Sequence, residues 1–245
     1  MTTAVMHPEH AGDERPALSG KAAWFLADWR DVLFVHYAID PAVLAPHVPF
    51  DLDLCDGVAW VSLVAFTQVG LRPAVGGRIA ALAMAPVATH AFLNLRTYVR
   101  VRGHAAICFL AEWIPNLLAR LVGPVLYGLP FRLGRLDYAV DDVRRVTARG
   151  GNCEMRSEQF KRCADLPDDF LLERYTAVTA TGPRRGRMFH IRHAPWTHER
   201  VDVTVADDSL IRHAAPWFAR ARLAGAHRSA GLLDVEIGGP HRIGT

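Results

Sequence analysis

The sequence predicts an α+β domain in which most of the strands are antiparallel. Strand-like runs recur at short spacing along the chain, and the helical segments between them are few and brief, which is typical of antiparallel sheets. No internal repeat or long linker interrupts the chain after residue 20. We therefore expect a single domain over residues 20–245, preceded by a disordered leader at residues 1–19.

The first strand and helix have clear local signals. Residues 31–39 are apolar and rich in strand-forming side chains, which predicts a buried strand. Asp40 and Pro41 then predict the start of a short helix, with Asp40 as its N-cap, and that helix ends before Pro49. A second strand is expected at residues 58–69.

The middle of the chain predicts a loop, a hairpin and a helix. Residues 70–87 are rich in Gly, Pro and Ala and predict a long loop that forms a lid or rim. Residues 90–102 and 105–111 predict a hairpin that turns at Gly103-His104, and residues 117–126 predict a helix.

The second half adds mainly strands. A helix is expected to begin near Leu166-Pro167. Further strands are expected at residues 131–138, 143–149, 153–160, 186–193, 200–206 and 229–237.

Composition excludes several classes of protein. Hydrophobic residues make up 51% of the chain and charged residues 22%, as in ordinary globular domains. The net charge of +3 is too small to indicate a nucleic-acid partner, and the short arginine runs at 144–149 and 184–187 are typical of solvated loops. Only Lys21 and Lys161 are lysines among the 28 basic residues, which leaves few candidates for amine chemistry.

No targeting or membrane segment is expected. The first 20 residues lack a basic start followed by an apolar run. The most apolar stretch, residues 105–129, is interrupted by Glu112, Asn116 and Arg120, so no membrane span is predicted. The four cysteines lack CxxC spacing, so we expect reduced thiols and a cytoplasmic protein.

Two segments place an arginine among polar and aromatic side chains. Strand alternation puts Asn94, Arg96 and Tyr98 on one face, where they could clamp a carboxylate or an enolate. The alternative is a solvent-facing strand or an arginine paired with a structural carboxylate. Arg174, beside Glu173, offers the same choice, and either Glu173 or Glu112 could be the partner of one of these arginines.

Histidines provide the other candidate groups. His36 lies beside Tyr37 in the strand at 31–39, and because both faces are apolar, the pattern leaves open which of the two faces inward. An inward His36 could act as an acid or base; the alternative is a buried structural histidine.

The segment around residue 196 suggests an aromatic wall but no metal site. His190 and His193 lie three residues apart on a predicted strand and so face opposite sides, and no firm metal spacing is present. Trp196 could form a pocket wall or belong to the core. No nucleotide-binding or nucleophile-elbow motif is present, so no cofactor and no metal are expected.

Taken together, these segments resemble a known superfamily. Arg30-Asp31 followed by VLFVHYAIDPAVLAPHVP resembles the opening of acetoacetate decarboxylase-like proteins. The resemblance is more specific to their YqjF-like family and covers residues 24–243; its further pieces are DGVAWVSLVAF, NLRTYVRVRG, YGLPF, FLLERY, HAPW and HRSAGLLDVEI. It implies antiparallel strands curled into a cone or barrel around a small-molecule pocket, with Arg30 at the site.

The chain departs from the decarboxylases at their reactive residues. Their segment Gly-Arg-Glu-x-x-Gly-Phe-Pro-Lys-Lys aligns with residues 123–132, where the Schiff-base lysine becomes Phe131 and the second lysine becomes Arg132. The glutamate expected two residues before Asn94 is Phe92.

These departures argue against imine catalysis. An imine needs a nucleophilic amine, which neither phenylalanine nor arginine supplies. Lys21 precedes the first core strand and Lys161 lies in a charged, turn-like stretch. We therefore expect that the protein is not a Schiff-base acetoacetate decarboxylase.

Three functions are compatible with the sequence. The first is a small-molecule enzyme of the lyase, dehydratase or cyclase type, acting on a carbonyl or carboxylate compound by acid–base chemistry, as in secondary metabolism. The alternatives are a non-catalytic module that binds a hydrophobic small molecule and a scaffold whose pocket is filled by side chains. We expect a small-molecule partner, no nucleic-acid or membrane partner, and a chain compatible with a homo-oligomer. The expected catalytic residues are His36, Arg96 and Tyr98, and the expected binding residues are Arg30, Phe92, Asn94, Phe131, Arg132, Arg174 and Trp196.

Overall fold

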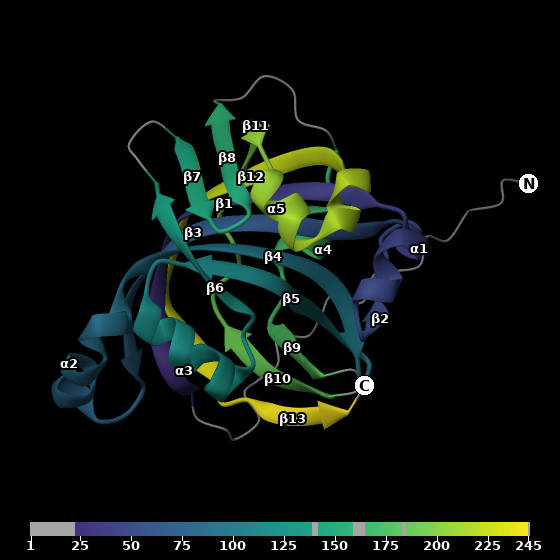
Figure 1. Ribbon diagram of the computed structural model, residues 1–245. Coiled ribbons are helices and arrows are strands. Elements are labelled where there is room, and N and C mark those ends of the chain that lie inside the picture. Colours follow the sequence, from purple (N-terminus) through teal and green to yellow (C-terminus); the bar gives the residue numbers. More distant parts are fainter. Residues whose placement is uncertain (1–22, 139–141, 159–164, 183–184, 245) are drawn as a thin grey trace, which may run out of the picture.

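The computed structural model describes residues 23–138, 142–158, 165–182 and 185–244 (Figure 1). The expected leader, both lysines and Cys163 lie outside the described residues. The other three cysteines are buried free thiols.

Most of the described chain forms one curved, mainly antiparallel sheet, as the sequence predicted (Figure 1). Its central strands are β1 (Ala23–Ile39), β3 (Ala59–Pro73), β4 (His90–Val101), β5 (His104–Ile114) and β12 (Arg222–Gly238). The strands on one side are β6 (Phe131–Asp137), β7 (Val143–Ala148), β8 (Gly151–Glu158) and β11 (Glu199–Asp207). The remaining strands are β2 (Asp51–Leu52), β9 (Thr176–Gly182), β10 (Arg185–Arg192) and β13 (His241–Gly244).

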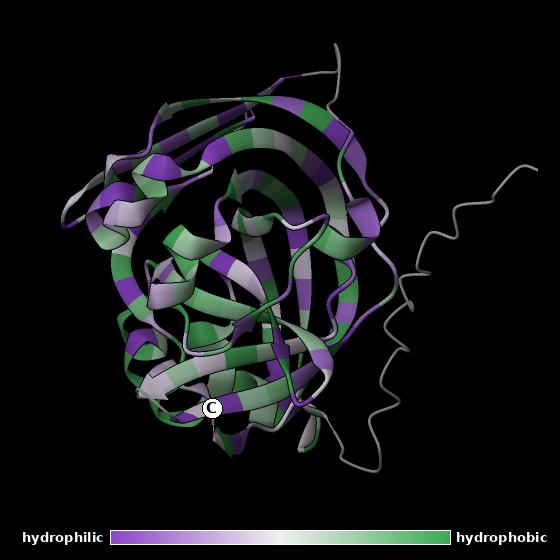
Figure 2. Cartoon of the chain, turned by 90° about the vertical axis from the view of Figure 1, so that its right-hand side faces the viewer, coloured by the Kyte–Doolittle hydropathy of each residue, from purple (hydrophilic) through white to green (hydrophobic). Residues whose placement is uncertain are grey.

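The sheet forms a ring because two routes of paired strands lead from β5 back to β12. One route passes through β6, β7, β8 and β11, and the other passes through β9 and β10. The central strands complete both routes, since β12, β1, β3, β4 and β5 pair in that order. Among these pairings only β5–β6 and β5–β9 are parallel. Figure 2 shows the strands curving around the interior.

The central strands belong to both routes, and both of their faces are therefore buried. Along β1, Leu33 and Val35 belong to one hydrophobic cluster, whereas Val32 and Phe34 belong to another. A strand that is buried on both faces has a nearly continuous apolar sequence, which is why residues 31–39 carry no clear alternation.

The described helices are short and lie between the strands. They are α1 (Pro41–Leu44), α2 (Gly77–Ala88), α3 (Leu117–Tyr127), α4 (Asp168–Leu172) and α5 (Ser209–Ala214), with 3-10 turns at Ala45–His47 and Pro216–Arg220. Within the described ranges, no helix has the length and apolar character needed to cross a membrane.

The predicted N-cap of α1 is confirmed. The Oδ1 atom of Asp40 accepts a hydrogen bond from the backbone N–H of Ala42 at 2.8 Å, and Pro41 occupies the first helical position. We expect Asp40→Ala to lower the free energy of unfolding by about 1 kcal/mol, because one N–H at the start of the helix loses its partner. Urea denaturation would measure this loss, and an unchanged midpoint would show that water replaces the cap without cost.

Most of the predicted elements are confirmed, including the hairpin of β4 and β5 and the helix α3. The loop prediction for residues 70–87 is wrong, because residues 70–73 complete β3 and most of the remainder forms α2. Gly76 and Gly77 have positive φ angles of 97° and 58° and mark the start of this helix. The Ala, Leu and Met residues after them are strong helix formers, and this preference outweighs the loop signal of the glycines.

Candidate functional site

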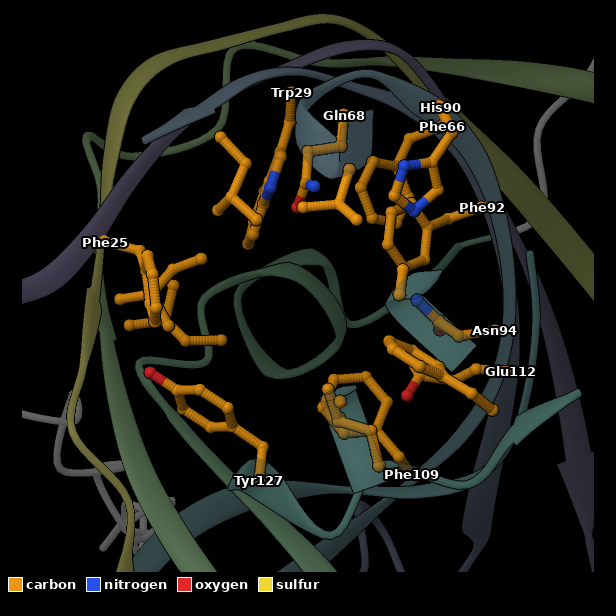
Figure 3. A pocket seen from close by; sticks show the side chains of 18 of the residues that line it. Phe25, Trp29, Phe66, Gln68, His90, Phe92, Asn94, Phe109, Glu112 and Tyr127 are labelled. Atoms are coloured by element: carbon orange, nitrogen blue, oxygen red, sulfur yellow. The ribbon is translucent and has the colours of Figure 1, made fainter. Parts of the chain in front are cut away.

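A cavity of about 410 Å³ lies inside the part of the ring that contains β10 (Figure 3). Strands β1, β3, β4 and β5 contribute about half of the lining residues, and α2 and α3 contribute about a third, among them Met84 and Val122. This size suits a small organic molecule.

Aromatic side chains contribute about a third of the residues in the wall. Phe66 stacks on Phe92 with ring centroids 5.0 Å apart, and Phe92 lies 5.9 Å from Phe131. Trp196 stacks against Trp29 at 6.1 Å. These contacts hold the apolar wall rigid but leave the space between the rings open, as Figure 3 shows.

Glu112 is the main polar feature of the cavity. It lies on β5 opposite Asn94 of β4, and both side chains line the cavity. Its side chain is buried, and Oε2 has no hydrogen-bond partner among the described residues. Burial in this apolar setting raises the pKa of Glu112 to about 8, because the charged form loses its hydration. The carboxyl group is therefore mostly protonated at neutral pH, and Figure 3 shows it beside Asn94.

Three further polar side chains have unsatisfied atoms at the cavity. The Oδ1 atom of Asn94, Nε of Arg96 and both ring nitrogens of His90 are buried without a hydrogen-bond partner among the described residues. Arg96 donates from Nη2 to the carbonyl of Leu171 at 3.3 Å, and its guanidinium lies 5.4 Å from the ring centre of Phe34. Buried polar groups normally have partners, so these atoms are suited to a bound molecule.

A second polar network lies behind the wall, on the same face of β1 as Phe34. His36 Nδ1 is 2.7 Å from the hydroxyl of Ser62, which is 2.7 Å from the hydroxyl of Tyr98. On its other side, His36 Nε2 is 2.9 Å from Nδ1 of His227, whose Nε2 is 2.9 Å from Asp168. Burial, then His227 and Arg96, hold the pKa of His36 well below its usual value, so its ring is neutral.

Five of the expected site residues line the cavity: Phe92, Asn94, Arg96, Phe131 and Trp196. Phe92 and Phe131 are the positions aligned with the decarboxylase glutamate and lysine, so the substituted positions do meet at this cavity. Their roles toward a ligand stay predictions.

The other expected binding residues, Arg30, Arg132 and Arg174, do not line this cavity. Alternation along β1 turns Trp29 inward and leaves the side chain of Arg30 56% exposed, 3.8 Å from Asp28. Arg132 is exposed with its guanidinium over Trp113. Arg174 is buried and makes an ion pair with Asp53 at 2.7 Å.

His36 and Tyr98, expected to be catalytic, belong to the network behind the wall and do not line the cavity. The sequence left open which of His36 and Tyr37 faces inward, and the structure shows that both are buried, on opposite faces of β1. Tyr37 packs on Phe218 in the hydrophobic cluster that contains Leu33 and Val35.

The pairing of Glu173 or Glu112 with Arg96 or Arg174, which the sequence left open, is not found among the described residues. Glu173 accepts hydrogen bonds from Tyr175 and from the backbone N–H of Trp196, and Arg174 pairs with Asp53 instead. The sequence suggested Glu112 as a possible partner for an arginine, and it did not predict that Glu112 lines the cavity. The available signal was a single acid inside an otherwise apolar strand.

Among the described residues, one group of side chains could hold a metal ion, although the sequence predicted none. The ligand atoms of Asp168, His198 and His227 lie within 4.8 Å of one another. His198 precedes β11 and His227 lies on β12, so tertiary packing rather than sequence spacing brings them together.

Comparison with known proteins places the chain by sequence and by fold. The chain is 29% identical over 202 residues to the uncharacterized protein YqjF of Bacillus subtilis, covering 74% of this chain and 78% of that protein. Solved structures with a similar fold include an acetoacetate decarboxylase-like enzyme from Sphingomonas wittichii, with 18% identity, a TM-score of 0.61 and coverage of 93% and 95% of the two chains.

Two further structures support the same fold at low identity. Acetoacetate decarboxylase from Legionella pneumophila has 11% identity, a TM-score of 0.63 and 98% coverage of each chain. The enduracididine biosynthesis enzyme MppR, solved with HEPES buffer bound, has 14% identity, a TM-score of 0.60 and 99% coverage of each chain. The fold is therefore that of acetoacetate decarboxylase-like proteins. The model of DUF2071, described as an uncharacterized conserved protein (COG2071), matches residues 26–228, and the chain belongs to this family.

Proposed function

We propose that the protein is an enzyme that binds a largely apolar carbonyl or carboxylate compound in the cavity and acts on it by acid–base chemistry without a Schiff base. The observation that carries this proposal is Glu112, a buried carboxyl with a free oxygen and a pKa raised to about 8 in the wall of a cavity. An acid–base group works best when its pKa lies near the working pH. Enzymes with this fold, such as those named above, lend general support.

In this proposal Glu112, Asn94 and Arg96 have different roles. In its ionised form Glu112 takes a proton from the carbon beside the carbonyl, and the electron pair moves onto the carbonyl oxygen. The unpartnered Nε–H of Arg96 is suited to donate to that oxygen, as is the Nδ2–H2 group of Asn94, whereas Oδ1 of Asn94 can only accept. Returning the proton from Glu112 to the substrate completes the cycle without any other reactant.

The residue at the aligned lysine position argues against an imine. That position is Phe131, which lines the cavity, and both lysines of the chain lie outside the described residues. Borohydride treatment in the presence of acetoacetate or pyruvate is expected to leave the protein mass unchanged. Covalent capture on Lys21 or Lys161 would contradict this part of the proposal.

The test begins with a ligand. Keto acids, β-diketones and aromatic polyketide-like carbonyl compounds are screened by thermal shift, because a compound that binds the folded state raises the Tm. For each binder, NMR in D2O measures deuterium incorporation beside the carbonyl. We expect Glu112→Gln to bind the compound and to lower the exchange rate by about 100-fold or more, because the amide cannot accept the proton.

Glu199→Gln is the matched control, since Glu199 is exposed and does not line the cavity. It should exchange at the wild-type rate. Exchange that continues unchanged in Glu112→Gln would overturn the role of Glu112.

A second candidate is a binding module for a hydrophobic molecule, favoured by the aromatic wall of Phe66, Phe92 and Phe131. Binding of the panel compounds without exchange or turnover would support it. The open space in the cavity argues against a scaffold filled by its own side chains.

A further inference from the structure

The contact of Tyr98 with the carbonyl of Leu171 selects one arrangement of protons in the network behind the cavity. The carbonyl of Leu171 can only accept, so the hydroxyl of Tyr98, 3.0 Å away, donates its one proton to it. The oxygen of Tyr98 therefore accepts from the hydroxyl of Ser62 at 2.7 Å. Since Ser62 has then used its proton, its oxygen accepts from Nδ1–H of His36, also at 2.7 Å.

The same reasoning continues to His227. A neutral His36 that carries its proton on Nδ1 has a lone pair on Nε2. This lone pair accepts from Nδ1–H of His227 at 2.9 Å. A neutral His227 then directs the lone pair of its own Nε2 at Oδ1 of Asp168, which is only 2.9 Å away.

Two electron-rich atoms at this distance require a cation between them or beside both. That cation is either a proton on His227 or a metal ion. The ligand atoms of Asp168 and His198, which lie within 4.8 Å of that of His227, favour the metal ion. His227 is fully buried on β12, so its orientation is fixed by packing and by His36.

A third ligand atom completes a recognisable donor set. Nε2 of His198 lies 3.5 Å from Oδ2 of Asp168, and all three ligand atoms lie within 4.8 Å of one another. The side chains of Asp168 and His198 are 26% and 25% exposed, so solvent reaches the site. Two imidazoles and one carboxylate, with a position open to water, are the ligands of a mononuclear zinc-type centre.

We propose that Asp168, His198 and His227 bind one divalent transition-metal ion of the zinc type, with water completing the coordination. The chain through His36, Ser62 and Tyr98 orients His227 by accepting its Nδ1–H, as outer partners of ligating histidines do.

Arg200 is compatible with this site. It donates to both oxygens of Asp168 at 3.0–3.2 Å and to the carbonyl of Leu166 at 3.0 Å. A carboxylate has about four lone-pair sites, so Asp168 can accept from Arg200 and ligate a metal at the same time. Arg200 then holds the carboxylate in place from its outer side.

The test measures metal binding to the full chain after chelator treatment. Zinc is titrated in competition with a chromophoric chelator, and cobalt absorption reports the geometry of the ligands. We expect one equivalent to bind. Asp168→Asn and His198→Ala should weaken binding by more than the about 10–100-fold that loss of an outer partner costs. Both side chains are partly exposed, so these variants are better suited than a change at the buried His227.

Two further variants make the result specific. Tyr98→Phe removes the hydroxyl at the far end of the chain, three hydrogen bonds from His227, and should weaken binding by up to about 10-fold without removing a ligand. His104→Ala alters an exposed histidine in the β4–β5 turn, outside the cluster, and should bind as the wild type does.

The outcomes separate the possibilities. Substoichiometric binding, or binding that is equally strong in His198→Ala, would overturn the site and leave a proton on His227 as the cation. Wild-type affinity in Tyr98→Phe would overturn the orienting role of the chain. Neither result depends on the proposed enzymatic activity, because no substrate is used.

Discussion

The free energy of unfolding is expected to fall by about 5 kcal/mol between about pH 5 and pH 9 through Glu112 alone. Burial raises the pKa of this carboxyl from its usual value near 4.5 to about 8 in the folded protein. Above pH 4.5 the unfolded chain releases the proton while the folded protein retains it. Each unit of increase in pH therefore lowers the free energy of unfolding. The loss is complete once the pH exceeds the folded pKa, because both states are then ionised.

Glu112→Gln isolates this effect, since the amide has a similar shape and does not titrate. Urea denaturation from about pH 5 to pH 9 should show a steep decline for the wild type and a shallower one for the variant, with the difference growing toward high pH. Glu199→Gln, which changes an exposed glutamate, should follow the wild type. Parallel curves for the wild type and Glu112→Gln would mean that water or a structural change relieves the buried charge.

Asp53→Ala should lower the free energy of unfolding by about 3–5 kcal/mol. The side chains of Asp53 and Arg174 are only 7% and 5% exposed, and their charged atoms lie 2.7 Å apart. Removing the carboxylate leaves the guanidinium of Arg174 buried without its counter-charge. Arg100, the second partner of Asp53 at 2.9 Å, is 59% exposed and is solvated when the pair is lost.

A double variant shows whether the cost comes from the stranded charge. Asp53→Ala combined with Arg174→Met should recover much of the loss, because no uncompensated charge remains buried. Glu154→Ala breaks the exposed pair with Arg145 and should cost no more than about 1 kcal/mol. If the double variant were as unstable as Asp53→Ala, lost packing would explain the effect better than charge.

Local signals in the sequence were sufficient for much of the fold. The apolar runs at residues 90–102 and 105–111, separated by Gly103-His104, determine a hairpin because turn and strand chemistry are adjacent in the chain. Asp40 and Pro41 determine the start of α1 for the same reason. The loss of the aligned lysine at Phe131 is likewise a property of the sequence, because it needs only residue identity.

The sequence-based predictions failed where the structure depends on contacts between residues that are distant in the sequence. At residues 70–87, glycines suggested a loop, but the helix preference of the residues after Gly77 and their packing over the cavity determine α2. The sequence left Glu112 open as a partner for an arginine, because it does not reveal that Oε2 of Glu112 has no hydrogen-bond partner among the described residues.

The sequence by itself determined the antiparallel α+β class, the family resemblance and the absence of a lysine where an imine would need one. Only the tertiary structure decided that Asn94 and Glu112 share a cavity wall, that Arg30 lies outside it, and that Asp168 meets two histidines. The physical reason is that the central strands are buried on both faces, so alternation along β1 and β5 carries no information about which side holds the site. Closure of the ring between distant strands supplies that information.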